Sequence, residues 1–126
     1  MRFTCTRLVT EDVAGLAAFY ERFTETLPVG TGDYVELRLP GAVLAICSRR
    51  SAEFMHGGAW TAASNKSAIL EFEVEDVDAE RTRLGAFVTD WVQEPKDMPW
   101  GNRSTLFRDP DGNMVNVFKP AGVIQA

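Results

Sequence analysis

The chain has 126 residues and a mass of 14.0 kDa, enough for one domain or one domain built from two small halves, with no need of a metal or disulfide to fold. Its hydrophobic content of 45% and charged content of 25% are typical of a soluble globular protein, and no apolar segment is long enough to cross a bilayer. The formal net charge of −5 disfavours nucleic-acid binding, which depends on Lys and Arg contacts to phosphates.

The first residues predict a cytoplasmic protein. Met1 is followed by a mixed polar segment, whereas a signal peptide begins with basic residues and an apolar run. We therefore expect no membrane partner, and we expect Cys5 and Cys47 to be reduced thiols.

The first part of the chain predicts a strand, a helix and three further strands. Asp12 is the expected N-cap of the helix, and Pro40-Gly41 is the expected turn of the last hairpin. The expected elements, in chain order, are a strand at 3–9, a helix at 13–23, a weak strand at 27–29, a strand at 34–39 and a strand at 42–47.

Residues 49–66 lack a clear period and predict a connecting loop or lid, with room for a short helix. The first pattern then repeats, with Asp76 as the helix N-cap, Gly85 after the helix and a tight turn at 109–112. The expected elements are a strand at 68–74, a helix at 77–84, a strand at 87–92, a loop at 95–101 and strands at 103–108 and 113–118.

The repeat of this order is the most informative feature of the sequence. Asp76 lies 64 residues after Asp12 (76 − 12 = 64), and both the strand–helix start and the closing hairpin recur. The chain thus predicts the α+β class, with two βαβββ modules that form a curved mixed sheet around a cavity and carry their helices outside. We expect one domain over 1–126, with module one at about 1–48, the connecting loop at 49–66 and module two at about 67–120.

Strand alternation predicts which side chains face away from the helices. Cys5 and Arg7 on the first strand should face the cavity, as should Glu71 and Glu73 on the matching strand of the repeat. Asn116 should face the cavity from the last strand.

Three stretches of the chain resemble the vicinal-oxygen-chelate superfamily of glyoxalases, bleomycin-resistance proteins and extradiol dioxygenases. They are the two strand–helix starts at 8–13 and 72–79, with Phe19-Tyr20 on the first helix, and the segment 98–113 that ends in Asp-Pro-Asp-Gly-Asn. Together they cover most of the chain outside the central loop.

The resemblance implies a metal site built from His or Gln on the first strand of a half and Glu on the last. Carried over by position, those ligands fall at Cys5, Ala45, Ile69 and Asn116. Ala45 and Ile69 have no donor atom, and the only histidine, His56, lies in the connecting segment. We therefore expect no metal and no cofactor.

Other residues are candidates for ligand contact. Trp60 in the connecting segment and Trp100, which the resemblance places near the cavity mouth, offer stacking surfaces, although each is also a plausible packing residue. Arg103 is placed to meet an anionic ligand or to be solvated. Arg7 and Glu71 occupy equivalent positions of the two halves and either orient a ligand or pair with each other.

These observations lead to a hypothesis of function. The chain is expected to be a metal-free small-molecule-binding protein of the glyoxalase/bleomycin-resistance type that sequesters a small aromatic or cationic ligand and forms a homodimer. The candidate ligand-binding residues are Cys5, Arg7, Glu71, Trp60, Trp100, Arg103 and Asn116. Two alternatives stay open: a lyase, isomerase or dioxygenase with an atypical metal site, and an interaction protein with a filled cavity. The sequence does not identify the ligand.

Overall fold

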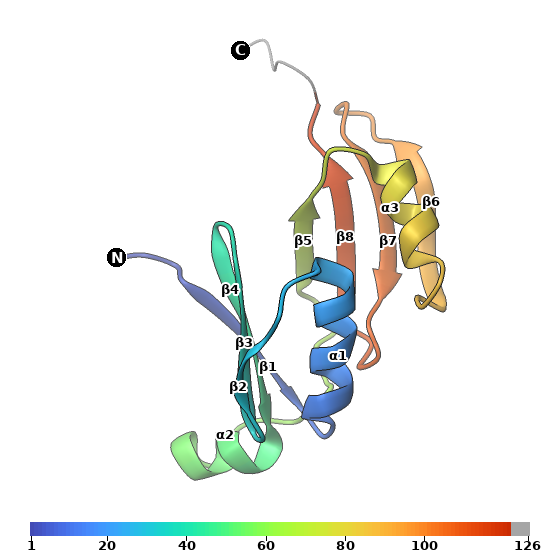
Figure 1. Ribbon diagram of the computed structural model, residues 1–126. Coiled ribbons are helices and arrows are strands. Elements are labelled where there is room, and N and C mark those ends of the chain that lie inside the picture. Colours follow the sequence, from blue (N-terminus) through green and yellow to red (C-terminus); the bar gives the residue numbers. More distant parts are fainter. Residues whose placement is uncertain (122–126) are drawn as a thin grey trace. The chain divides into compact units, whose positions relative to one another are not determined.

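The computed structural model describes residues 1–121 and divides into two compact units, Met1–Ser64 and a second that begins at Asn65 (Figure 1). The elements of the first unit are β1 (Cys5–Thr10), α1 (Val13–Thr24), β2 (Val29–Thr31), β3 (Tyr34–Leu39), β4 (Ala42–Ser48) and α2 (Arg49–His56). Those of the second are β5 (Ile69–Glu73), α3 (Val77–Leu84), β6 (Asp90–Asp97), β7 (Arg103–Arg108) and β8 (Met114–Lys119). None of the helices in this described part is both long and apolar enough to span a bilayer.

The first unit is a four-stranded mixed sheet in the order β1-β4-β3-β2. β4 pairs in parallel with β1 and antiparallel with β3. α1 packs on β3 and β4, and its residues Leu16, Tyr20 and Phe23 are buried, as are Leu37 and Ile46 of these strands. One face of this sheet is therefore covered by α1, and the side chains between those of the core point to the other face.

The second unit repeats this arrangement in the order β5-β8-β7-β6, with β8 parallel to β5. Figure 1 shows α3 across one face of this sheet, over β6 and β7. Val77 and Leu84 of α3 are buried, as are Phe107, Val115 and Val117 of the strands. The predicted α+β class and the two βαβββ modules are confirmed.

Both predicted helix N-caps are confirmed. The Asp12 carboxylate accepts a hydrogen bond from the Gly15 amide at 2.9 Å, and Asp76 accepts one from the Ala79 amide at 3.0 Å. These bonds satisfy amides that lack a partner inside the helix.

The strand predicted at 87–92 is present but its bounds were wrong, because it begins at Asp90 and continues to Asp97, into the loop predicted at 95–101. The amides of Phe87 and Val88 donate to the Leu84 carbonyl in the turn that ends α3, so they are not available to a ladder. Pro95 was predicted to lie in a loop, but it lies within β6. A proline is tolerated there because β6 is an edge strand whose pairing with β7 is irregular.

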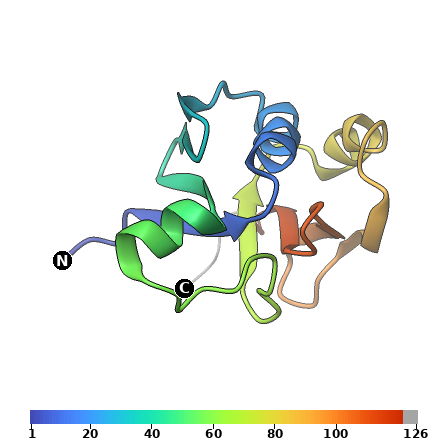
Figure 2. The ribbon, with the colours of Figure 1, turned by 90° about the horizontal axis from the view of Figure 1, so that it is seen from below.

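The weak strand predicted at 27–29 lies at Val29–Thr31. Here Gly30 has φ of +109°, and a Cβ on it would lie 2.6 Å from the Tyr34 carbonyl oxygen. The strand thus includes a glycine that brings its backbone close to β3. The predicted connecting segment contains α2, which Figure 2 shows beside β1, with which it is in contact.

The turn between β7 and β8 is held by one buried carboxylate. Asp109 is only 4% exposed and accepts hydrogen bonds from the amides of Asp111 and Asn113 and from the Asn113 side chain, all at 2.8–2.9 Å. The Gly112 amide also donates to the Asp109 carbonyl, with Gly112 at φ of +85°. The tight turn predicted at 109–112 is confirmed, with the Asp109 side chain at its centre.

Asp109→Ala should lower the free energy of unfolding by about 2–4 kcal/mol, because it leaves buried donors of the turn without an acceptor. Urea unfolding monitored by circular dichroism measures this change. The matched control, Asp90→Ala at an exposed position of β6, should stay within about 0.5 kcal/mol of the parent. Equal stability of the two variants would show that other contacts support the turn.

Candidate functional site

Each sheet has an open face, defined here as the face opposite its covering helix. On the first sheet, strand register places Ala45 of β4 between Arg7 of β1 and Glu36 of β3. Arg7 is exposed and Ala45 is buried. The predicted outward direction of Cys5 and Arg7 agrees with the burial of Leu8 on the other face.

A polar cluster that sequence reasoning missed lies beside Arg7 on this face. The Tyr34 hydroxyl donates to Glu36 Oε2 at 2.9 Å, and Arg38 Nε donates to Glu36 Oε1 at 3.1 Å. These two bonds, the tyrosine's first, lower the pKa of Glu36. Partial burial, and then the bond to Glu36, raise the pKa of Tyr34. The cluster therefore presents an ionised carboxylate and a protonated phenol at neutral pH. Tyr34, Glu36 and Arg38 are every second residue of β3, and this alternation in the sequence could have predicted that they share one face of the sheet.

The two cysteines differ in environment. Cys47 is fully buried next to Val9 in register, and this burial raises the pKa of its thiol more than the charge of Arg7 and its hydrogen bond lower it. Cys5 is exposed near the start of β1. Only Cys5 of the pair is therefore accessible to a ligand or reagent.

On the open face of the second sheet, three side chains form a hydrogen-bonded chain. Ser104 Oγ donates to Asn116 Oδ1 at 2.7 Å, and Asn116 Nδ2 donates to Glu71 Oε1 at 3.0 Å. Ser104 is 4% exposed, whereas Glu71 is exposed. The structure thus brings together two predicted residues, Glu71 and Asn116. It adds Ser104, which alternation along β7 places on the same face.

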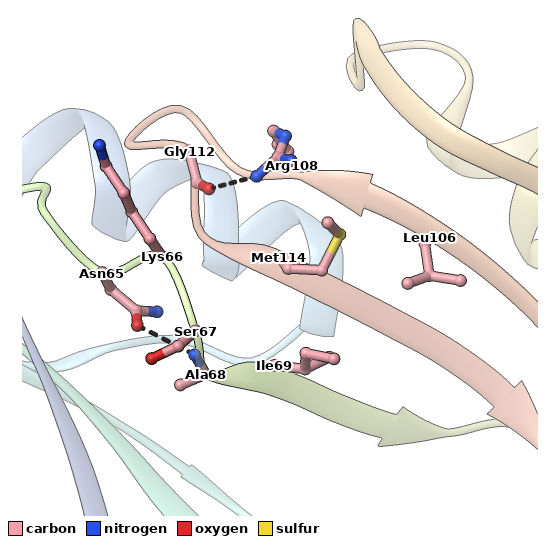
Figure 3. A pocket seen from close by; sticks show the side chains of 9 residues that line it. All are labelled: Asn65, Lys66, Ser67, Ala68, Ile69, Leu106, Arg108, Gly112 and Met114. Atoms are coloured by element: carbon pink, nitrogen blue, oxygen red, sulfur yellow. Dashed lines mark hydrogen bonds between the residues drawn. The ribbon is translucent and has the colours of Figure 1, made fainter.

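A shallow pocket of about 180 Å³ opens on the same sheet, at the end where β5 and β8 begin (Figure 3). The backbone before β5 forms one wall, because Asn65 Oδ1 accepts from the Ala68 amide and Asn65 Nδ2 donates to Asn113 Oδ1. Sequence reasoning missed this pocket. The residues that line it are Asn65, Lys66, Ser67, Ala68, Ile69, Leu106, Arg108, Gly112 and Met114.

The remaining candidate residues lie elsewhere. Trp100 is 68% exposed in the loop before β7, and Trp60 lies beside His56, with ring centroids 5.4 Å apart. Arg103 donates two hydrogen bonds to the Asp78 carboxylate, at 2.8 and 2.9 Å, and one to Asp97 at 3.1 Å. These partners raise the pKa of Arg103 and occupy its guanidinium. An anionic ligand would compete with both carboxylates for it.

The sequence pattern of the glyoxalase/bleomycin resistance protein/dioxygenase superfamily matches residues 2–117 of the chain. The chain belongs to this superfamily. Among curated proteins, no sequence matches it.

Solved structures show the same superfamily fold. A glyoxalase/bleomycin resistance protein/dioxygenase from Nocardioides is 21% identical, with a TM-score of 0.82, and the match covers 99% of this chain and 87% of that one. A glyoxalase-related enzyme from Fulvimarina pelagi is 22% identical, with a TM-score of 0.82 and coverage of 100% and 96%. A lactoylglutathione lyase from Agrobacterium tumefaciens is 21% identical, with a TM-score of 0.72 and coverage of 94% and 92%. Identities this low establish a shared fold. They do not establish a shared activity.

The positions where superfamily members are expected to hold a metal do not offer a donor set in this chain. Ala45 and Ile69 have aliphatic side chains, which leaves the Cys5 thiol and the Asn116 amide. The Asn116 amide is already bonded to Ser104 and Glu71. Within residues 1–121, no group of three or more His, Cys, Asp and Glu side chains is placed to hold a metal ion.

One thiol of the folded protein should react rapidly with dithionitrobenzoate, and the second only after unfolding. The physical reason is the exposure of Cys5 and the burial of Cys47, whose raised pKa further disfavours the reactive thiolate. Absorbance of the released thiolate counts the reacted groups. Cys5→Ser should remove the rapid phase and Cys47→Ser should keep it; the reverse result would contradict the placement of the two thiols.

Proposed function

We propose that this superfamily member is a metal-free binding protein that sequesters a small aromatic or cationic molecule on the open face of its second sheet. The observation that carries the proposal is the chemistry of the positions carried over from metal-dependent members. Ala45 and Ile69 provide no ligand atom, while Glu71, which follows Ile69 on the same face of β5, forms a polar, hydrogen-bonded group with Asn116. Such a group orients a ligand without a metal.

The charges of the second sheet favour a cation. Glu71 and Glu73 both lie on the open face of β5 and both are exposed. The Asn116 amide bonds one oxygen of Glu71 and leaves the other oxygen to meet a ligand. The net charge of −5 also attracts cations to the protein as a whole.

The exposed tryptophan favours a flat ligand. Trp100 has no ring partner within the part of the chain that the structure describes, unlike Trp91, which packs against Phe107 beneath Arg81. An exposed indole ring can stack on an aromatic or cationic group for about 0.5–2 kcal/mol.

Benzyltrimethylammonium, which joins an aromatic ring to a permanent cation, should quench tryptophan emission saturably. Glu71→Gln should weaken its binding about two- to fivefold because an exposed charge pair is lost, and Trp100→Ala should remove most of the quenching. Fluorescence titration measures both effects. Glu75→Gln, which removes an exposed carboxylate between β5 and α3, is the matched control and should bind as the parent does.

The alternative function is a lyase, isomerase or dioxygenase with an atypical metal site, in which Cys5, Glu71, Glu73 and Asn116 would take part. It differs from the proposal in metal content. Protein purified without a metal-affinity tag should contain no stoichiometric metal, and manganese, iron, nickel or zinc should not raise its melting temperature. A bound metal at about 100 times its dissociation constant adds roughly 2.7 kcal/mol, or about 10 °C. That shift, or turnover lost in Glu71→Gln or Cys5→Ser, would replace the binder with the enzyme.

We also propose that the chain is a homodimer. Each sheet ends in edge strands, β1 and β2 in one unit and β5 and β6 in the other. Large apolar side chains are exposed in the first unit, among them Phe3, Leu27 and Phe54. Both features are surfaces that association covers.

Light scattering during gel filtration should give about 28 kDa, twice the chain mass of 14.0 kDa. Phe54→Ser, at a side chain that is 91% exposed on α2, should shift the elution toward the monomer if α2 lies in the interface. A mass of one chain at about 100 µM protein, well above the micromolar dissociation constants of weak dimers, would contradict the proposal.

A further inference from the structure

The pocket of the second unit carries two positive charges that lack counter-ions. Lys66 and Arg108 both line it, and neither forms an ion pair with any residue in the described range 1–121. Most arginines of this acidic protein do have an acidic partner. Those with one are Arg38, Arg49, Arg50, Arg81, Arg83 and Arg103. The two cations of the pocket therefore carry charge that no described carboxylate neutralises.

The positions of these cations are set by the fold. Arg108 Nη1 donates to the Gly112 carbonyl at 3.2 Å, which holds one edge of the guanidinium and leaves its other N–H groups for a ligand. The two hydrogen bonds of Asn65 fix the backbone from which Lys66 extends. Figure 3 shows Lys66 on the segment before β5 and Arg108 at the end of β7, with the turn that carries Gly112 between them. Two like charges at one pocket repel each other, and an anion between them removes that cost.

The floor of the pocket is apolar. Ile69, Met114 and Leu106 come from three neighbouring strands, and Ile69 is 53% exposed. The volume of about 180 Å³ is comparable to that of an engineered apolar cavity, ~150 Å³, which holds one benzene ring. An inorganic anion would leave this surface in water, whereas a ring with an acidic group would cover it.

We propose that this pocket binds a small organic acid, with its ring or hydrocarbon body on Ile69, Met114 and Leu106 and its carboxylate between Lys66 and Arg108. The site differs in charge from the cation-binding face around Glu71, and the proposal does not rest on the function proposed above. It provides the open face of the second sheet with a neighbouring position for a ligand of opposite charge, because Leu106 lies opposite Asn116 and Ile69 lies two residues before Glu71.

Benzoate is the probe, used with the full chain labelled with ¹⁵N. Its addition should shift the amide resonances of residues 66–69 and 114 saturably, with a dissociation constant of about 1–10 mM, as expected for so small a ligand. Lys66→Gln and Arg108→Gln should each weaken benzoate about two- to fivefold, and the effect should shrink as salt is added. Lys96→Gln and Arg2→Gln, at exposed cations outside the pocket, are the matched controls and should leave the affinity unchanged.

Two further ligands separate the contributions of charge and apolar surface. Benzyl alcohol has the ring without the charge, and inorganic phosphate has the charge without the ring, so both should bind more weakly than benzoate. The proposal is overturned if benzyl alcohol binds as well as benzoate, if phosphate binds as well, if the shifts fall outside the pocket, or if no saturable shift appears at about 100 mM benzoate. Failure of benzyltrimethylammonium to bind would leave these results unaffected, because it tests Glu71 and Trp100.

Discussion

The structure of each unit depends on the parallel pairing of its first strand with its last. β4 enters the sheet between β1 and β3, and β8 enters between β5 and β7, so both last strands are hydrogen-bonded on two sides. Their helix-facing residues, such as Val115 and Val117, are fully buried. Because side chains alternate along a strand, the same pairing places Ala45 and Asn116 in the middle of the open faces.

The fold is repeated in the two units, but the chemistry of the open faces is not. In the first unit the central position is a methyl group, Ala45, between Arg7 and the ionised Glu36. In the second it is the Asn116 amide, which accepts from Ser104 and donates to Glu71. The Asn116 amide must direct its nitrogen toward Glu71, because the flipped orientation would place its oxygen against the Glu71 carboxylate. The repeat thus preserves the framework, and the side chains on it provide two different surfaces.

Membership of the superfamily establishes the framework and leaves the activity to the site residues. The aliphatic side chains of Ala45 and Ile69 remove donors where metal-dependent members are expected to place ligands. The cationic side chains of the second unit differ in their partners. Arg103 forms ion pairs with Asp78 and Asp97, whereas Lys66 and Arg108 at the pocket form none with the described residues. A pairing of this kind stabilises a loop or strand, while unpaired charge near an apolar surface is available to a ligand.

The sequence by itself determined the class of the fold, both helix starts, most strands and the outward direction of Arg7, Glu71 and Asn116. These features depend on local spacing, which a single stretch of residues contains. It missed the start of β6, because the end of α3 takes the amides of Phe87 and Val88. Only the tertiary structure decided that Ser104 bonds Asn116, that Arg103 is paired, and that Lys66 and Arg108 share a pocket. Those contacts join residues that are far apart in the chain, and no local pattern specifies which side chains meet after folding.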